Sequence, residues 1–321
     1  MKQAVIDIGS NTIRLVVYRC VGKKIFQLLN TKNYASLISY HKNGIMTPAG
    51  VEIATNVVTE QVEVATVLGV KKIDVIATAS LRNISNNEEI INKIFEKTRL
   101  LTRLLTGKQE AYFGLMGMLS AYDTNNGICV DLGGGSFEIT QYENRLCINS
   151  ISIDGGCLSL YEEFVSGLLP TSIELSNLKK SVNKKLKEIP WINKAEPQDF
   201  YIIGGTGRAL ARLHRGLSAS TQDINGYCLK VEEISETVDT ICQMGLGGVK
   251  YLNRVLPERL TTALPGITVL SCIAKRCNAK KATISKYGLR EGYITSEILE
   301  HSGGKIEWLN ETKKVATSTE S

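Results

Sequence analysis

Apolar and polar residues follow one another along this chain in a pattern that predicts the same series of elements twice. Runs in which every second residue is apolar predict strands, and apolar residues three and four apart predict helices. In the first part of the chain the predicted strands are Ala4–Ile8, Ile13–Cys20, Lys24–Leu29, Lys72–Ala77 and Arg99–Leu105. The predicted helices of this part are Val51–Leu68, Asn87–Lys97 and Lys108–Tyr122.

The series begins again at Gly127. The elements predicted there are two strands around a glycine-rich turn, a strand near Arg145–Ile153, helices from Leu158, a strand at Phe200–Ile203, a helix at Arg208–His214, a strand near Ala282–Ile284 and a helix from Glu291. Three strands followed by alternating helices and strands, found twice, predict two α/β domains of related fold. The polar turn Asp123–Asn126 separates them, which gives domains at 1–123 and 124–302. We expect the polar tail 303–321 to be frayed.

Two segments at the start of these series carry the same pattern. VIDIGSNTIRLVV (5–17) and CVDLGGGSFEIT (129–140) align without a gap, so that Asp7 matches Asp131. Each is an apolar strand that ends at the aspartate, then a turn of small residues and an alternating strand. Such turns expose backbone N–H groups that hold phosphate oxygens. Each aspartate lies where a carboxylate holds a divalent cation or a water, so the pair of turns predicts binding of a phosphate chain.

The second turn is the richer in glycine. Its predicted phosphate-binding residues are Gly133, Gly134, Gly135 and Ser136. Consecutive glycines weaken a sheet and are more than a hairpin needs, which favours a phosphate contact over a simple bulge. Alternation places Glu138 on the same face as Ser136, so Glu138 can join Asp131 in holding Mg²⁺.

The first turn offers hydroxyl and amide side chains as well as backbone donors. Its predicted phosphate-binding residues are Ser10, Asn11 and Thr12, with Asp7 as a metal ligand. Arg14 shares a face with Thr12 and suits a phosphate or a carboxylate, although a solvated strand residue is an equal alternative.

A third glycine segment, Ile202–Arg208, runs from a strand into a helix. Helix N-termini attract anions, so Gly205 and Thr206 are predicted to bind phosphate, with Thr206 as a possible helix cap. Glycine and threonine are common at strand-to-helix turns, so this segment alone is weak evidence for phosphate binding. The presence of the other two turns strengthens the prediction.

Two charged residues lie between the glycine turns. Arg82 follows the predicted strand Lys72–Ala77, close to the carboxyl end where α/β proteins bind ligands, and its alternative is a surface arginine. Glu110 lies in the first turn of a mostly apolar helix, where a carboxylate either caps the helix or orients a water as a base. Periodicity alone does not decide between these interpretations.

Composition limits the classes of function. The chain has 321 residues, 43% of them apolar, with no run near the roughly 20 needed to cross a bilayer and no secretory pattern. We therefore expect a cytoplasmic protein without a membrane partner. Its eight cysteines form no Cys-x-x-Cys pair, which argues against zinc, and three histidines leave little for Ser–His–Asp catalysis. The net charge of +6 suits a polyanion, but at 6% aromatic residues a nucleic-acid partner is not expected.

Eight segments together resemble the Ppx/GppA family of exopolyphosphatases and guanosine pentaphosphate phosphohydrolases, over nearly the whole chain. They are IDIGSNTIRLVV, ATASLRN, GKQEA, VDLGGGSFEIT, DGGCLSLYEEF, IIGGTGRALARL, LPERLTTALPGITVL and YGLREGYI. The order and spacing of these segments are more specific than any one glycine loop. The chain resembles the short form of the family, without an added helical domain.

The resemblance implies two actin-like (ribonuclease H-like) α/β domains that flank a cleft. It implies Mg²⁺-dependent attack of water on the terminal phosphate of polyphosphate or on the 5′ phosphate of guanosine pentaphosphate. Glu110 is then the base, Arg82 neutralises charge, and Asp131 and Glu138 bind Mg²⁺. A homodimer is implied, while K⁺ as an activator and the preferred substrate stay open.

Three departures from the family pattern stand out. Asn83-Ile84 follows Arg82 where Glu-Ala is common, Gln109 replaces a frequent glutamate, and Ser159 stands where an arginine often lies. Ser159 removes one expected phosphate contact. Two alternatives share the phosphate turns: an actin-fold kinase or ATPase, and a non-catalytic sensor of guanosine tetra- or pentaphosphate. The Arg82 and Glu110 segments favour the hydrolase.

Overall fold

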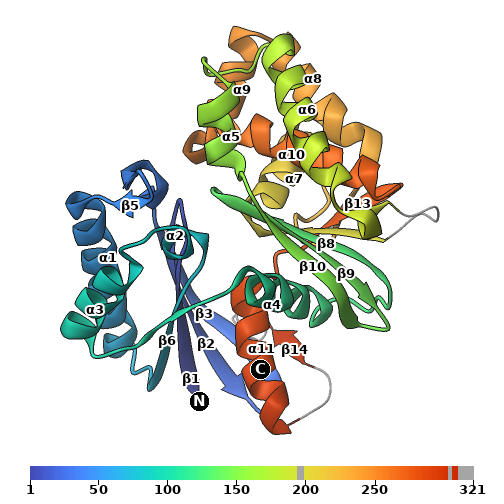
Figure 1. The fold of residues 1–321 in the computed structure, drawn as a ribbon. Coiled ribbons are helices and arrows are strands. Elements are labelled where there is room, and N and C mark those ends of the chain that lie inside the picture. The colour runs from blue at the N-terminus through green and yellow to red at the C-terminus, as the bar shows by residue number, and fades with distance from the viewer. Residues whose placement is uncertain (194–198, 303–305, 310–321) are drawn as a thin grey trace, which may run out of the picture. The chain divides into compact units, whose positions relative to one another are not determined.

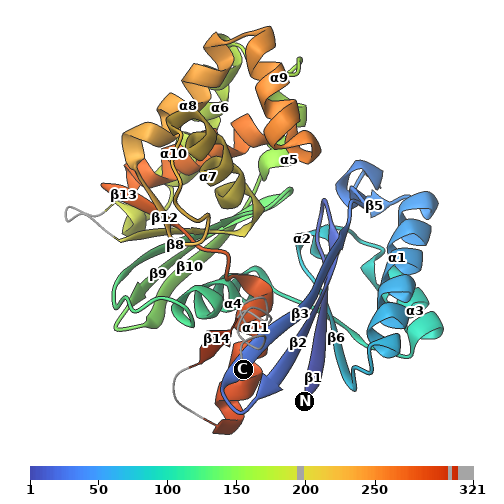
Figure 2. The same ribbon diagram turned by 180° about the vertical axis from the view of Figure 1, so that it is seen from behind.

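A computed structural model describes residues 1–193, 199–302 and 306–309, and the chain divides into two compact units (Figures 1 and 2). One unit comprises Met1–Glu110 and Arg290–Ser321, and the other comprises Ala111–Leu289. Both passages between units lie within helices, α4 (Gly107–Leu119) and α11 (Leu289–Ser302). The sequence placed the boundary later, at Asp123–Asn126, and gave the last helix to the second domain.

The difference comes from packing that is not local in sequence. Apolar residues of α4 cluster with Cys129, Tyr142 and Ile203 of the second sheet, so most of this helix belongs to the second unit. The start of α11 is bonded to the first sheet, since Tyr18 Oη donates to Glu291 Oε1 at 2.8 Å.

The first unit is built on a six-stranded sheet with the order β14-β3-β2-β1-β6-β7. Its strands are β1 (Lys2–Ile8), β2 (Ile13–Val21), β3 (Lys24–Asn33), β6 (Lys72–Ala77), β7 (Thr102–Leu104) and β14 (Glu307–Leu309). Helices α1 (Pro48–Val67) and α3 (Asn87–Thr98) cover one face, and α11 lies on the other (Figures 1 and 2). The short elements are η1 (Leu37–Tyr40), β4 (His41–Lys42), β5 (Ile45–Met46) and α2 (Ala79–Arg82).

Strand β14 falls in the tail that the sequence predicted to be frayed. It pairs in parallel with β3, with Trp308 opposite Ile25. The prediction is therefore wrong for 307–309, because a short strand finds an open sheet edge that no local pattern signals. Residues 303–305 and 310–321 lie outside the described residues.

The second unit has a six-stranded sheet with the order β10-β9-β8-β11-β13-β12. Its strands are β8 (Gly127–Leu132), β9 (Ser136–Glu143), β10 (Leu146–Asp154), β11 (Phe200–Ile203), β12 (Tyr227–Lys230) and β13 (Lys281–Ile284). The helices on one face are α5 (Cys157–Phe164), α6 (Ser172–Lys187), α7 (Gly204–Ser218), α8 (Val231–Gln243), α9 (Leu246–Val255) and α10 (Ala263–Arg276). Helix α4 lies on the other face (Figure 1), and short turns η2 (Pro190–Ile192) and η3 (Pro257–Arg259) join the elements.

The two sheets confirm the predicted pair of related α/β domains. The order β3-β2-β1-β6-β7 in the first sheet is repeated as β10-β9-β8-β11-β13 in the second. In both, the first three strands are antiparallel and the next two run parallel to the first. Strand β12 was not predicted, because a four-residue edge strand carries little alternation. Across the described part of the chain, every helix is too short or too polar to cross a membrane.

Candidate active site

The two glycine turns have the same backbone geometry. The Gly9 N–H donates to the Thr12 carbonyl at 3.0 Å, and the Gly133 N–H donates to the Ser136 carbonyl at 3.0 Å. A side chain on Gly9 would place its Cβ 3.0 Å from the Thr12 carbonyl oxygen, so glycine leaves room for this close turn. The duplication predicted from the sequence is therefore also a duplication of structure.

In each unit a following segment holds the carbonyls of its turn. The Ser36 and Ile38 N–H groups donate to the Asn11 and Ser10 carbonyls, each at 3.0 Å. In the second turn the donors to the Gly133, Gly134 and Gly135 carbonyls are the N–H groups of Cys157, Leu158 and Gly155, at 2.9, 3.0 and 2.9 Å. Because a trans peptide directs its N–H opposite to its C=O, carbonyls turned toward the protein leave the N–H groups facing the other way. That orientation suits an anion.

Ser159 supports the second turn. Its Oγ donates to the Gly134 carbonyl at 3.2 Å, beside the backbone bonds of the same segment. Gly156 comes so close that an added Cβ would lie 2.5 Å from the Gly133 oxygen. Where an arginine would offer a phosphate contact, this chain therefore has a short hydroxyl that bonds the turn itself.

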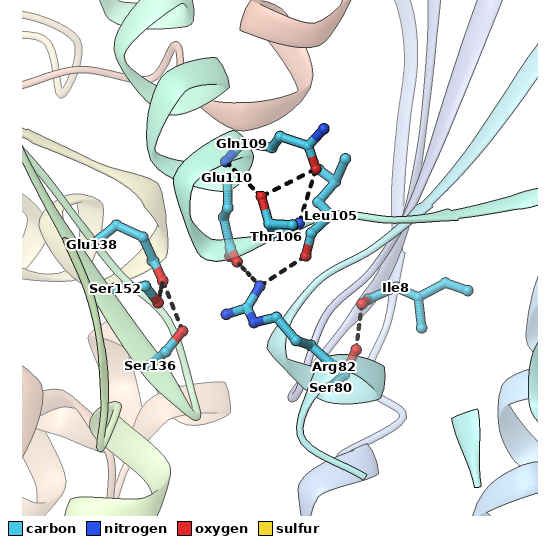
Figure 3. A network of polar contacts seen from close by, with 10 residues as sticks. All are labelled: Ile8, Ser80, Arg82, Leu105, Thr106, Gln109, Glu110, Ser136, Glu138 and Ser152. Atoms are coloured by element: carbon cyan, nitrogen blue, oxygen red, sulfur yellow. Dashed lines mark hydrogen bonds and ion pairs between the residues drawn. The ribbon is translucent and has the colours of Figure 1, made fainter. Parts of the chain in front are cut away.

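Asp131 and Glu138 lie directly opposite each other in the β8–β9 pairing, so their side chains share a face of the sheet. Glu138 is buried, and its Oε1 accepts hydrogen bonds from Ser136 Oγ at 3.0 Å and Ser152 Oγ at 2.6 Å (Figure 3). The predicted shared face of Ser136 and Glu138 is confirmed. Two hydroxyl donors fix the orientation of this carboxylate.

The third glycine segment packs against Asp131. Gly204 has φ of +78°, and a Cβ there would lie 2.0 Å from Asp131 Oδ1, so the backbone passes directly over the carboxylate. The guanidinium of Arg259, in η3, lies close against Gly205 and leaves no room for a side chain.

Thr206 does not have the position that we expected. The residue that caps α7 is Ile203, and Thr206 is fully buried, where its Oγ1 donates to the Leu132 carbonyl at 2.9 Å. The capping prediction is wrong because the helix begins two residues earlier, at Gly204. The hydroxyl of Thr206 ties α7 to β8, so its contact with a phosphate stays a prediction without support from this geometry.

Glu110 and Arg82 form an ion pair in the first unit. Arg82 Nη1 lies 2.9 Å from Glu110 Oε2 and also donates to the Leu105 carbonyl at 3.0 Å (Figure 3). Their side chains are 21% and 13% exposed, so both groups are shielded but reachable. The structure thus joins the two residues that the sequence singled out separately.

A neighbouring pair caps the helix that carries Glu110. The Thr106 N–H donates to Gln109 Oε1 at 3.0 Å, and the Gln109 N–H donates to Thr106 Oγ1 at 3.2 Å. This reciprocal pair is a capping box, in which glutamine serves as well as glutamate. Gln109 and Thr106 therefore cap the helix, and the carboxylate of Glu110 is bonded to Arg82. The cap does not need Glu110, whose role as a base stays a prediction.

Asp7 has a different partner from the cation expected for it. Arg290 Nη1, at the start of α11, lies 2.7 Å from Asp7 Oδ2, with side chains 14% and 12% exposed. Arg14 stands opposite Asp7 in the strand register, so the two side chains share a face of the sheet.

The donors fit a magnesium ion in the second unit better than in the first. No group of three or more His, Cys, Asp or Glu side chains that could hold a metal occurs among the described residues. Mg²⁺ is usually held by one or two carboxylates together with waters and substrate phosphates. Asp131 and Glu138 offer such a pair beside a phosphate turn, whereas Asp7 is already neutralised by Arg290.

The model of the Ppx/GppA phosphatase family matches residues 16–301. The chain belongs to this family. Exopolyphosphatase 1 of Mycobacterium tuberculosis (strain ATCC 25618 / H37Rv) is 22% identical over 324 residues, with 99% of this chain and 94% of the relative covered. A putative exopolyphosphatase of Haemophilus influenzae is 22% identical over 296 residues, with 91% and 90% covered. As a family member, the protein is a phosphatase.

Solved structures of the family have the same fold. The Aquifex aeolicus member of the Ppx/GppA family matches with a TM-score of 0.79 at 24% identity, covering 94% of this chain and 98% of its own. An exopolyphosphatase from Cytophaga hutchinsonii matches with a TM-score of 0.84 at 18% identity, covering 95% and 100%. The α/β fold implied by the resemblance is confirmed.

Sequence reasoning missed two arginines of the family segments. Arg259 lies in LPERLTTALPGITVL and Arg290 in YGLREGYI, and both segments carried the resemblance without a role for any residue. Arg259 lies against Gly205, and Arg290 is paired with Asp7. Both contacts join residues that are far apart in the sequence. A neighbouring Glu and Arg within a segment rich in apolar residues was the signal that could have found each of them.

Proposed function

We propose that this protein is a Mg²⁺-dependent exopolyphosphatase, which releases the terminal phosphate of inorganic polyphosphate. The curated relatives named above are exopolyphosphatases, and their alignments cover nearly the whole of both chains. Guanosine pentaphosphate offers the same terminal phosphoanhydride and is the second substrate that we would test.

The observation that carries the proposal is that different residues in the first turn of α4 cap the helix and pair with Arg82. Gln109 and Thr106 satisfy the helix end, so the cap does not need the carboxylate of Glu110. Arg82 orients that carboxylate at 2.9 Å. A shielded carboxylate held by a guanidinium is suited to orient a water and to accept its proton.

The glycine turns and the arginines meet the main demand of phosphoryl transfer, which is to position and neutralise a polyanion. In each turn, the N–H groups opposite the protein-bound carbonyls support the proposed contact with phosphate oxygens, and they belong to Asn11 and Thr12 in the first turn and to residues 134–136 in the second. Arg82 contributes positive charge next to Glu110, where charge develops on the transferred group.

Asp131 and Glu138 would hold Mg²⁺, with Ser136 and Ser152 fixing Glu138. Bound there, the ion would neutralise charge on the phosphate oxygens and on the leaving group. Asp7 is left out of this ligand set, because its carboxylate is bonded to Arg290.

In the proposed reaction the oxygen of a water attacks the terminal phosphorus, and one water proton passes to Glu110. The bond between that phosphorus and the bridging oxygen breaks, and the bridging oxygen stays with the shortened chain. The products are orthophosphate and a polyphosphate one unit shorter, and Glu110 returns its proton to the leaving phosphate or to solvent.

The test measures phosphate release with Mg²⁺ from polyphosphate, guanosine pentaphosphate and ATP by the wild type, Glu110→Gln and Gln109→Ala. Loss of a general base should lower kcat by roughly 10²- to 10⁴-fold in Glu110→Gln. Gln109→Ala removes the glutamine half of the capping box and should cost up to roughly 1 kcal/mol of stability while kcat is retained.

Each other outcome points elsewhere. Equal loss of kcat in both variants would mean that Glu110 acts only through the helix end. Release from ATP alone would indicate an actin-fold ATPase. Binding of guanosine tetraphosphate without any turnover would indicate a sensor.

A further inference from the structure

A second positively charged site lies in the second unit, between helices α6 and α10. It is a pocket of about 380 Å³ lined by Lys179, Asn183, Ser271, Cys272, Lys275 and Arg276. The lining residues on each helix are four positions apart, and such residues share a helix face. One face of α6 and one face of α10 are therefore both turned into the pocket.

The side chains that line this pocket carry positive charge and include no counter-charge. Lys179, Lys275 and Arg276 are cations, no carboxylate lines the pocket, and within the described residues none of the three lies in an ion pair. Lys275 Nζ donates to Ser235 Oγ at 3.2 Å, a hydroxyl that orients the ammonium without neutralising it. Three uncompensated cations around one pocket repel one another, and a polyanion would relieve that repulsion.

Arg276 carries an unused donor. Its Nε is buried and has no hydrogen-bond acceptor in the part of the chain that the structure describes. Cations at a helix end can be explained by the helix dipole alone, which would account for Lys275 and Arg276 at the end of α10. Lys179 lies in the middle of α6, however, and a dipole does not explain a buried guanidinium N–H without an acceptor.

Two of the lysines act on one thiol that lines the pocket, that of Cys272. Burial raises the pKa of the Cys272 thiol, while the ammonium groups of Lys179 and Lys275 act in the opposite direction. Both charges therefore act on the same sulfur, although they come from different helices. Ser271 and Asn183 add neutral hydrogen-bonding groups beside it.

Helix α10 connects this pocket with the second glycine turn. At its start Gly266 packs against Thr206 and Leu132, where an added Cβ would lie 2.7 Å and 3.3 Å from their side-chain carbons. With a rise of about 1.5 Å per residue, Arg276 lies roughly 15 Å further along the helix axis. The pocket is thus within reach of a phosphate chain whose end is held near the second turn.

We propose that the pocket binds phosphate groups of a long polyphosphate chain at a distance from the reacting end. This inference rests on the proposed polyphosphate substrate and adds a second contact to it. A short chain engages only the glycine turns, while a long chain engages both places. Affinity should therefore rise with chain length through the cations of α6 and α10.

The test compares the binding of tripolyphosphate and of long-chain polyphosphate by calorimetry in the Glu110→Gln background, where turnover is slowed. In the double variant Lys179→Gln/Arg276→Gln, long-chain affinity should fall roughly 10- to 100-fold, since two charge-assisted hydrogen bonds are lost. Tripolyphosphate affinity should stay within about twofold. Lys180→Gln, an exposed neighbour on α6, is the matched control and should bind like the parent.

Charge-conserving Lys179→Arg/Arg276→Lys protects the test against misfolding, because it should keep the long-chain affinity if charge is what matters. Unchanged long-chain affinity in the neutral variant, or equal loss for both chain lengths, would overturn the proposal. If long-chain polyphosphate binds through the pocket but the wild type releases no phosphate, the proposed function is refuted and the pocket is still a polyphosphate-binding site. Guanosine pentaphosphate should displace tripolyphosphate, and it should leave the contact of a long chain with the pocket in place.

Discussion

Replacing Gly204 by alanine tests whether the start of α7 is built around Asp131. Gly204 has φ of +78°, and an alanine Cβ would lie 2.0 Å from Asp131 Oδ1. Gly69 offers a matched control, since its φ is +71° and an added Cβ meets no atom within 4 Å. Both substitutions place alanine at a positive φ, and only the one at Gly204 also forces a contact with the carboxylate.

The expected magnitudes follow from these distances. Holding alanine in the left-handed region costs about 1–2 kcal/mol at either position. At Gly204 the overlap must also be relieved by moving Asp131 or the first turn of α7, and overpacking of this kind costs roughly 1–3 kcal/mol more. We therefore expect Gly204→Ala to lose about 2–5 kcal/mol and Gly69→Ala about 1–2 kcal/mol.

Urea unfolding gives the free energy of unfolding of each variant, and phosphate release at a temperature where both are folded gives kcat/KM. Gly204→Ala should lower kcat/KM by at least about tenfold, because a proposed metal ligand is displaced, whereas Gly69→Ala should match the wild type. Equal losses of stability in the two variants, or full activity in Gly204→Ala, would refute the reasoning.

Three further predictions follow from single contacts. Thr206→Val should lose roughly 1–3 kcal/mol of stability, because a buried β8 carbonyl loses its donor, and thermal unfolding should show Thr206→Ser near the wild type. Asp7→Asn should cost roughly 2–4 kcal/mol by leaving Arg290 without its counter-charge, and Arg290→Met in the same chain should recover part of that loss. Glu174 accepts backbone hydrogen bonds, first from Thr171, which lower its pKa from 4.5 to about 2. A carboxyl whose pKa is lowered in the folded state stabilises the fold at pH values above its unfolded-state pKa and loses that effect as pH falls through the folded-state pKa. Glu174→Gln should therefore be roughly 0.5–1 kcal/mol less stable than the wild type at pH 7, and the difference should vanish as pH falls below about 2.

The sequence predicted the elements around the site well because their signals are local. The strands Lys72–Ala77 and Phe200–Ile203 were predicted with the bounds that they have in the structure, and both glycine turns were found. Alternation also placed Ser136 and Glu138 on one face, which the hydrogen bond between them confirms. In each case the pattern and the structure that it predicts lie within a few neighbouring residues.

Which charged groups meet was decided by the tertiary structure. Arg82 reaches Glu110 across 28 positions, and Arg290 reaches Asp7 across 283, so neither partner is visible in the local pattern. Thr206 looked like a helix cap but is buried by β8, and the last helix packs on the first sheet instead of the second. Local periodicity sets the backbone of an element, because it depends on the residues in that element. The partner of a charge depends on how distant elements pack, and only the folded chain brings them together.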